Sequence, residues 1–201
     1  MIFPVQPRQK FGTVDLAYWE DFLTEEDIHK IISLPEWNDL KNARVGGQGQ
    51  ENIINKKIRD SKINWIGLRE ETMDIYQKIS NVISEVNNRF FNFNIEGMYE
   101  NIQLGLYSSD DKGHYDWHVD RSPNEYSNAP RKLSMALLLN DPTEFEGGEF
   151  QVKIQSDQIQ NLELKKGRAW FFPSWVLHRV APVHKGIRKS LVVWAGGPAF
   201  K

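Results

Sequence analysis

The spacing of apolar residues changes near Phe90, and this change constrains the fold more than any other feature of the sequence. Before it, apolar residues recur every three or four positions, as on one face of a helix. We expect one helix after Thr24, whose side chain suits an N-cap, ending before Pro35. A second is expected over about Arg69–Asn88. The rest of the first third is expected to be loop.

After Phe90, short segments rich in β-branched and aromatic residues alternate with turn sequences. Helices followed by many short strands predict an α+β fold whose body is a β-sandwich or double-stranded jelly roll. The strand count alone leaves an immunoglobulin-like sandwich open. We expect one domain over residues 1–201, with helical and loop support over 1–90 and the core from about 91 to 201. The expected strands are Tyr99–Tyr107, Tyr115–Asp120, Lys132–Leu139, Glu149–Ile154, Arg168–Phe172, Leu177–Val180 and Ile187–Trp194.

The composition removes several classes of protein. The absence of cysteine excludes disulfides, thiolate zinc sites and cysteine nucleophiles, so a metal would need His, Asp or Glu ligands. A net charge of -2 gives no basic footprint for nucleic acid, and no apolar run is long enough to span a bilayer. The segment Met1–Lys10 lacks the apolar stretch of a secretory signal. We therefore expect a cytoplasmic protein with no nucleic-acid or membrane partner; the oligomeric state is not indicated.

Two histidine motifs stand close together in the chain. Residues two apart on a strand share a face, so His118 and Asp120 could bind one ion, but His114 and Asp116 fit the same pattern. His178 is a candidate third ligand. Two histidines and a carboxylate are the ligand set of non-haem Fe(II) oxygenases. Arg188, ten residues later, could grip the carboxylate of a co-substrate through two hydrogen bonds.

The stretch from about Ile102 to Trp194 resembles the 2-oxoglutarate- and Fe(II)-dependent dioxygenases, in particular their prolyl 4-hydroxylase-like, PKHD-type branch. This resemblance implies a double-stranded β-helix (jelly-roll or cupin-like) core with N-terminal supporting helices. It also favours His118 and Asp120, because these enzymes carry a tyrosine three residues before the ligand histidine, as Tyr115 stands here. The motifs that carry it, in the expected order, are Tyr107, Gly113–Asp120, Arg131–Ser134, Leu139-Asn140, Gly147–Phe150, Gly167–Pro173, His178, Gly186–Arg188 and Trp194.

The resemblance also implies the cofactors and the reaction. Fe(II) would be held by His118, Asp120 and His178, and 2-oxoglutarate would place its distal carboxylate on Arg188, with Tyr107 and Ser190 beside it. Dioxygen and 2-oxoglutarate would give succinate and CO2 while a C–H bond is hydroxylated, with ascorbate as the reductant. Related halogenases lack the carboxylate ligand, so the presence of Asp120 indicates hydroxylation.

The identity of the substrate is less constrained. The resemblance predicts that Tyr115, Arg131 and Trp194 line a substrate channel suited to a peptidyl prolyl residue. A free amino acid or another small molecule is the alternative substrate, and a non-catalytic jelly-roll binding module is the rival of a different class. Three departures from the family pattern leave the iron and co-substrate assignments standing but weaken the proline assignment. Arg188 stands where collagen-type prolyl hydroxylases have a lysine. Gly196 stands where plant and algal prolyl hydroxylases have a histidine, and Leu138 where some relatives have a tyrosine that contacts 2-oxoglutarate.

Two further expectations concern the surroundings of the site. The polar loops over Val45–Gln50 and Arg121–Pro130 carry Gly or Pro and are predicted to close over the substrate. Apolar side chains are predicted to surround the iron and protect it from side reactions; those expected there are Leu137, Leu139, Phe171 and Val193.

Overall fold

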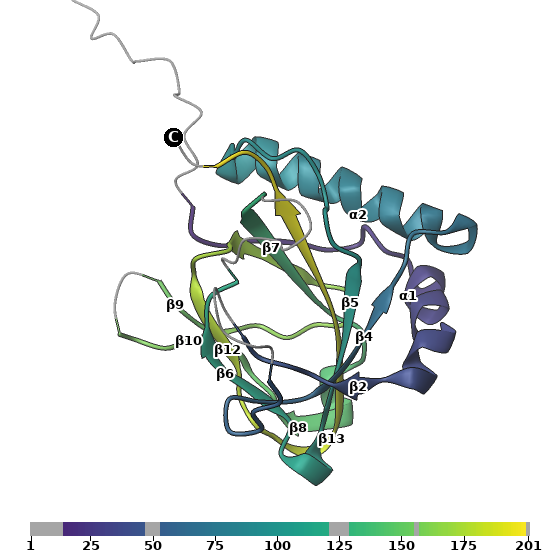
Figure 1. The fold of residues 1–201 in the computed structure, drawn as a ribbon, viewed down its shortest axis with the longest axis vertical. Coiled ribbons are helices and arrows are strands. Elements are labelled where there is room, and N and C mark those ends of the chain that lie inside the picture. Colours follow the sequence, from purple (N-terminus) through teal and green to yellow (C-terminus); the bar gives the residue numbers. More distant parts are fainter. Residues whose placement is uncertain (1–13, 47–52, 121–128, 155–156, 200–201) are drawn as a thin grey trace, which may run out of the picture.

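The computed structural model describes residues 14–46, 53–120, 129–154 and 157–199. Within them, two antiparallel sheets form the body of the molecule (Figure 1). The larger sheet has the order β1-β11-β7-β13-β5-β4-β2, with β8 paired to β13. Its strands are β1 (Ala17–Trp19), β2 (Lys41–Asn42), β4 (Lys62–Ile66), β5 (Ile102–Ser108), β7 (Arg131–Leu138), β8 (Phe145–Gly147), β11 (Ala169–Pro173) and β13 (Val183–Gly196).

The smaller sheet has the order β10-β9-β12-β6-β3. Its strands are β3 (Arg59–Asp60), β6 (His114–His118), β9 (Phe150–Lys153), β10 (Gln160–Leu162) and β12 (Leu177–Val180). The arrangement is a double-stranded β-helix, and the fold class expected from the sequence is confirmed. All seven predicted strands exist, although β13 extends beyond the predicted Ile187–Trp194 at both ends.

Two α-helices lie over one face of the larger sheet (Figure 1). Helix α1 (Glu25–Ile32) begins as predicted, because the Thr24 hydroxyl accepts from the Asp27 amide and Asp27 accepts from the Thr24 amide. Helix α2 (Met73–Val86) runs on into a π-helical turn (Asn87–Phe91). Single 3₁₀ turns are Pro35–Asp39, Glu70–Thr72, Ser109–Asp111 and Pro142–Glu144. No helix of the described residues has the length and apolar character needed to cross a membrane.

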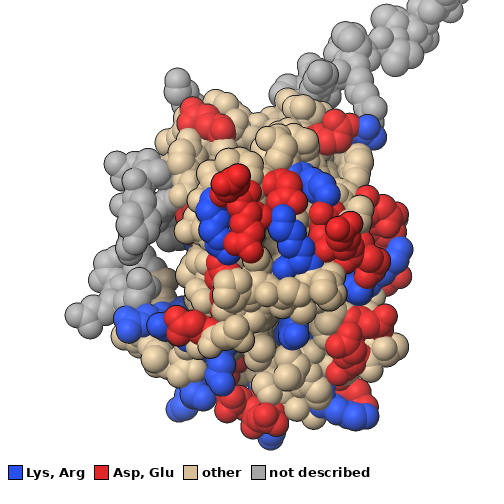
Figure 2. All heavy atoms as spheres, turned by 90° about the vertical axis from the view of Figure 1, so that its right-hand side faces the viewer, with Lys and Arg blue, Asp and Glu red and all other residues tan. Residues whose placement is uncertain are grey.

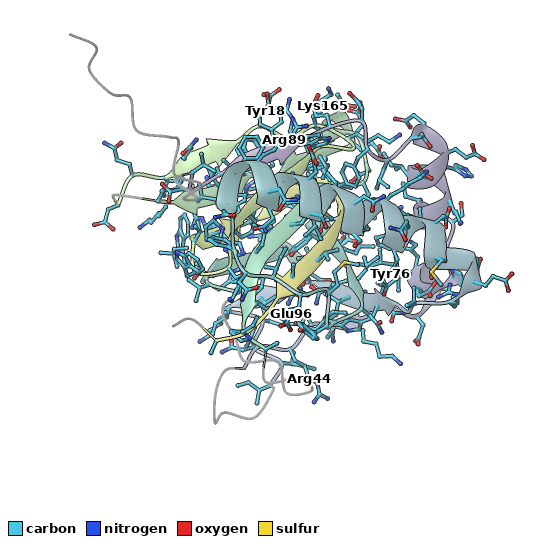
Figure 3. The ribbon with its side chains drawn as sticks, turned by 90° about the horizontal axis from the view of Figure 1, so that it is seen from above. Tyr18, Arg44, Tyr76, Arg89, Glu96 and Lys165 are labelled. Carbon is cyan, nitrogen blue, oxygen red and sulfur yellow. The ribbon has the colours of Figure 1, made fainter. Side chains whose placement is uncertain are left out.

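The helices and the sheets enclose two apolar cores. Ile31 of α1 and Ile79 of α2 are fully buried with sheet residues such as Leu191, and burial of each such side chain contributes about 1.5–3 kcal/mol. The Tyr76 hydroxyl reaches from α2 to the sheet and donates to the Ile66 carbonyl at 2.6 Å (Figure 3). The second core lies between the sheets, around Phe172.

The outer face beside α1 carries acidic and basic side chains interspersed, as Figure 2 shows. Two ion pairs tie the helices together across it, Lys30 with Asp74 at 2.8 Å and Lys78 with Asp27 at 2.6 Å. Surface pairs of this kind contribute little stability each, so burial of the apolar helix faces holds the helices on the sheet.

One expectation about the first third was wrong. Helix and loop alone were predicted there, but β1 and β2 to β4 lie in this region, and β4 pairs with β5 along its whole length. These strands have two to five residues, too few for an alternating pattern to be recognised. The predicted closing loops over 45–50 and 121–130 fall mostly outside the described residues; Val45 forms an isolated bridge with Ile53.

Candidate metal and co-substrate site

Three potential metal ligands meet at one end of the smaller sheet. His118 ends β6 and stands directly opposite His178 of β12 in the strand register, so their rings lie side by side at 4.1 Å between centroids. Asp120 follows two residues later. Its Oδ1 lies 3.7 Å from His118 Nε2 and its Oδ2 3.6 Å from His178 Nε2. These residues form the one such cluster of three or more potential ligands in the described residues, with all donor atoms within 4.8 Å.

The backbone fixes which nitrogen of each imidazole faces the cluster. His118 Nδ1 lies 2.7 Å from the Asp116 carbonyl, and His178 Nδ1 lies 2.8 Å from the Val176 carbonyl. A carbonyl oxygen only accepts, so each Nδ1 must carry the proton and donate it. In the neutral rings the Nε2 lone pairs therefore point to Asp120, the arrangement in which a backbone partner orients a metal-binding histidine.

The charges of the cluster suit a cation. Burial lowers the pKa of His118 well below its ordinary value, and the neighbouring His178 adds to the effect. Burial alone would raise the pKa of Asp120, but His178, His118 and Arg131 together hold it below its ordinary value. The Ser134 hydroxyl also donates to Asp120 Oδ2 at 2.8 Å. At neutral pH a neutral His118 and an ionised Asp120 are therefore ready to bind a cation.

This donor set fits Fe(II). Two histidines and one carboxylate on a single face are the ligands of non-haem iron oxygenases. Donors at right angles around an ion about 2.1 Å away stand about 3 Å apart, so the observed 3.6 and 3.7 Å need to close by less than an ångström. The alternative pair, His114 and Asp116, lies outside the cluster, since His114 faces the carbonyls of Lys112 and Lys57 and Asp116 is exposed.

A pocket of about 660 Å³ between the sheets contains the cluster. That volume lies in the range of small-molecule sites. The side chains predicted to bind the metal, the co-substrate or the substrate all line it: the three ligand candidates together with Tyr107, Tyr115, Arg131, Arg188, Ser190 and Trp194. The structure brings every one of these residues into one pocket.

Arg188 is the most unusual charge in this pocket. It is 4% exposed and lies opposite Tyr107 in the strand register, its Cζ 5.5 Å from the centre of that ring. Its Nε has no hydrogen-bond partner, and within the described residues it forms no ion pair. Burial lowers the pKa of this guanidinium. Gly148 packs against its stem, where a Cβ would come within 3.0 Å of Arg188 Cδ. A buried cation without a partner calls for an anionic ligand.

Arg131, which was predicted to line the substrate channel, is bonded mainly within the protein. Its Nε donates to Glu100 at 2.6 Å and its Nη2 to the other oxygen of Glu100. The guanidinium lies 3.8 Å over the Trp194 ring, and Nη1 reaches the Asp120 carbonyl at 3.4 Å. Most of its donors are therefore used inside the protein, and Glu100, which the sequence did not single out, is its partner.

The apolar wall was assigned to the wrong face of the larger sheet. Leu137, Leu139, Phe171 and Val193 are buried in the core beneath the helices. Successive residues of a strand point to opposite faces, so their neighbours line the pocket instead. The apolar side chains found there include Ala136, Phe150, Phe172, Val180 and Val192.

Other residues of the site were not singled out for a role by the sequence. Ser134 and Ser174 are fully buried, their hydroxyl oxygens 2.9 Å apart. Since the Ser134 proton goes to Asp120, Ser174 must donate to Ser134. Arg59 and Gln103 also line the pocket. Serines in strands are common, and Arg59 lies in a region expected to be loop, so only the three-dimensional pairing reveals them.

Comparison with known proteins supports the same chemistry. The model of the family described as "2OG-Fe(II) oxygenase superfamily" matches residues 102–196, which include the whole ligand cluster and Arg188. The match spans just under half of the chain. Together with the ligand cluster and the hydroxylase relatives, it indicates a 2-oxoglutarate-dependent dioxygenase whose cofactors are Fe(II) and 2-oxoglutarate. Ascorbate suits the family as a reductant.

The relatives are of the PKHD type. A PKHD-type hydroxylase of Pseudoalteromonas atlantica is 26% identical over 186 residues, covering 89% of this chain and 77% of the relative. One of Synechococcus is 40% identical over 84 residues, 41% of this chain and 36% of the relative. Several other curated relatives are matched over little more than a third of their length.

Solved structures share the fold. A prolyl hydroxylase from Trichoplax adhaerens, in complex with a hypoxia inducible factor oxygen degradation domain peptide fragment, has a TM-score of 0.73 at 21% identity. The match covers 92% of this chain and 84% of that one. A Pseudomonas putida prolyl-4-hydroxylase has a TM-score of 0.69 at 21% identity, covering 93% and 95%.

Proposed function

We propose that this dioxygenase hydroxylates a C–H bond of a peptidyl prolyl residue, while 2-oxoglutarate and O2 are converted to succinate and CO2. His118, Asp120 and His178 hold the iron in this proposal. Arg188 holds the distal carboxylate of 2-oxoglutarate. Tyr107 and Ser190, which share its pocket, complete the co-substrate site.

One observation carries the proposal. The ligand cluster and the unpaired guanidinium of Arg188 open on the same pocket, so a dicarboxylate can reach a metal at one end and a cation at the other. A charge-assisted bidentate pair at Arg188 would relieve the cost of its burial. A vestigial or purely structural metal site would not need a buried guanidinium in the same pocket.

The residues of the chain have defined tasks in the reaction. Bound Fe(II) supplies the activation of O2 with 2-oxoglutarate as electron donor. The backbone carbonyls of residues 116 and 176 hold the imidazoles in their binding orientation. Ser134 orients the Asp120 carboxylate, and the apolar side chains of Phe150 and Phe172 keep water from the reacting C–H bond.

The peptidyl prolyl substrate is supported by the relatives and by the aromatic walls. The Trichoplax adhaerens neighbour is a prolyl hydroxylase bound to a peptide, and the Pseudomonas putida neighbour is a prolyl-4-hydroxylase. Trp194 lines the pocket with an aromatic ring that suits packing against a pyrrolidine, and Arg131 stacks on this ring. Tyr115 also lines the pocket, with its ring stacked on His118. Strands from both halves of the chain build these walls, which supports a single catalytic domain.

The test is 2-oxoglutarate turnover with Fe(II) and ascorbate, measured as succinate, together with mass spectrometry of proline-containing peptides and free amino acids. Succinate formation and the gain of one oxygen atom by a peptidyl proline would support the proposal. A protein that forms no succinate under any condition would contradict it. Oxygen gain by a free amino acid, with every peptide unchanged, would replace the substrate class and leave the reaction type standing.

A further inference from the structure

A second buried guanidinium lines the pocket beside the ligand cluster. Arg59 of β3 is 8% exposed and stands opposite Tyr115 of β6 in the strand register. Its Nε donates to Ser61 Oγ at 2.9 Å and its Nη2 to Gln103 Oε1 at 3.0 Å. Its Cζ lies 4.4 Å over the centre of the Tyr115 ring.

All of these partners are neutral. Within the described residues Arg59 has no carboxylate in salt-bridge range, whereas the pocket residue Arg131 is paired with Glu100. A guanidinium has five N–H donors, of which two are used here. A buried charge held only by neutral groups pays a desolvation cost that an anion would offset.

The position of Arg59 separates it from the proposed 2-oxoglutarate site. Arg188 lies on β13 of the larger sheet, opposite Tyr107, whereas Arg59 lies on β3 at the edge of the smaller sheet. The Tyr115 ring lies between Arg59 and the ligand cluster, stacked on His118 at 3.5 Å with 14° between the planes. With the co-substrate carboxylates assigned to Arg188 and the metal, Arg59 is left for the molecule that is hydroxylated.

We propose that Arg59 binds a carboxylate of the hydroxylated substrate, so that the enzyme selects substrates with an anionic group close to the C–H bond that reacts. The inference rests on the proposed function. Two sources share this chemistry: the α-carboxylate of a free amino acid, and the side chain of an Asp or Glu residue next to a peptidyl proline. Bidentate geometry between a guanidinium and a carboxylate would supply the selectivity.

The experiment measures the binding of matched probes to protein loaded with Fe(II) and 2-oxoglutarate under nitrogen, where no turnover occurs. Calorimetry compares proline with prolinamide, and acetyl-Pro-Asp-amide with acetyl-Pro-Asn-amide. In the wild type, at least one carboxylate probe should bind about tenfold or more tightly than its amide. The pair that shows this preference identifies the source of the anion. Equal affinity within both pairs, or no binding of any probe, overturns the inference.

Variants test whether Arg59 causes the preference for carboxylate probes over their amides. Arg59→Gln should reduce the carboxylate-to-amide ratio to about one while the affinity for the amide stays within about twofold. Lys41→Gln is the matched control, because Lys41 also lines the pocket but its side chain is 73% exposed and paired with Asp39. It should retain the wild-type ratio. If Arg59→Gln retains the carboxylate-to-amide affinity ratio, or loses affinity equally for both probes of a pair, then Arg59 only supports Tyr115.

A third variant covers the case in which Arg59→Gln fails to fold. Arg59→Lys keeps the charge but loses the bidentate fork, so the ratio should fall several-fold with the amide affinity unchanged; an unchanged ratio overturns the inference. Succinate formation by the wild type separates the two proposals. Its absence contradicts the proposed function, whereas succinate formation without any carboxylate preference contradicts only the role of Arg59.

Discussion

Replacement of Arg188 by methionine should change stability and co-substrate binding in opposite directions. The methionine keeps a long apolar stem in the space beside Gly148 but removes a guanidinium that is 4% exposed and lacks an ion-pair partner in the described residues. In the ligand-free protein that charge is desolvated without compensation. Its removal should therefore raise the free energy of unfolding by about 1–3 kcal/mol.

The same substitution should weaken the binding of 2-oxoglutarate. Loss of one partner from a buried charge-assisted pair costs about 2–5 kcal/mol, which corresponds to a rise of about 30- to several-thousand-fold in the KM for 2-oxoglutarate. Affinity for Fe(II) should change little, because Arg188 lies opposite Tyr107 in the strand register and belongs to the other sheet from His118 and His178.

The assay is succinate formation against 2-oxoglutarate concentration, with thermal unfolding of the apoprotein measured in parallel. Each kcal/mol should shift the melting temperature by about 2–4 °C in a chain of this size. Lys185→Met is the control on the same strand, since Lys185 is exposed and pairs with Glu146. A KM for 2-oxoglutarate within twofold of the wild type, whatever the melting temperature, would refute the assignment of Arg188.

Three further outcomes follow from the site. Asp120→Ala should abolish 2-oxoglutarate turnover while Asp116→Ala stays nearly neutral, because Asp116 is exposed; the reverse result would reassign the metal site. Ser134→Ala should weaken Co(II) binding, followed by absorbance, about 10–100-fold, and Ser134→Thr should restore it; equal affinities would show that the hydrogen bond to Asp120 is dispensable. Trp194→Ala and Arg131→Ala should lose peptide hydroxylation but retain succinate formation. A parallel loss of both activities would instead assign these residues to the fold or the iron site.

Periodicity predicted the elements that are long enough to show it. The spacing of Met73 to Val86 gave α2, and the β-rich segments after Phe90 gave strands close to their observed bounds. Strand β4 was missed because five residues, Lys62–Ile66, contain barely two repeats of an alternating pattern. Its identity as a strand depends on pairing with β5, which is separated from it by a whole helix.

The face of the sheet on which each strand side chain lies was predictable in principle. Arg188, Ser190 and Trp194 stand at even spacings on β13, and all line the pocket. Val193 is adjacent to Trp194 and so had to face the helices, as it does. The error at Leu137 and Phe171 was of the same kind. The pair of serine hydroxyls behind Asp120 was not predictable, because Ser134 and Ser174 are 40 residues apart and meet only when β7 and β11 pair.

The pocket combines two segments of the chain with different contributions. The proposed iron ligands and Arg188 all lie within residues 102–196, the part that matches the family. Arg59, Trp65 and Glu100 lie outside this part, yet they line the same pocket. The residues proposed for O2 and 2-oxoglutarate chemistry thus lie in one segment, while part of the pocket wall comes from the other. β3 and β4 enter the two sheets as edge and near-edge strands and carry none of the proposed iron ligands, so their pocket side chains can change without removing one of those ligands. The N-terminal third is therefore where differences in substrate among such enzymes should be sought.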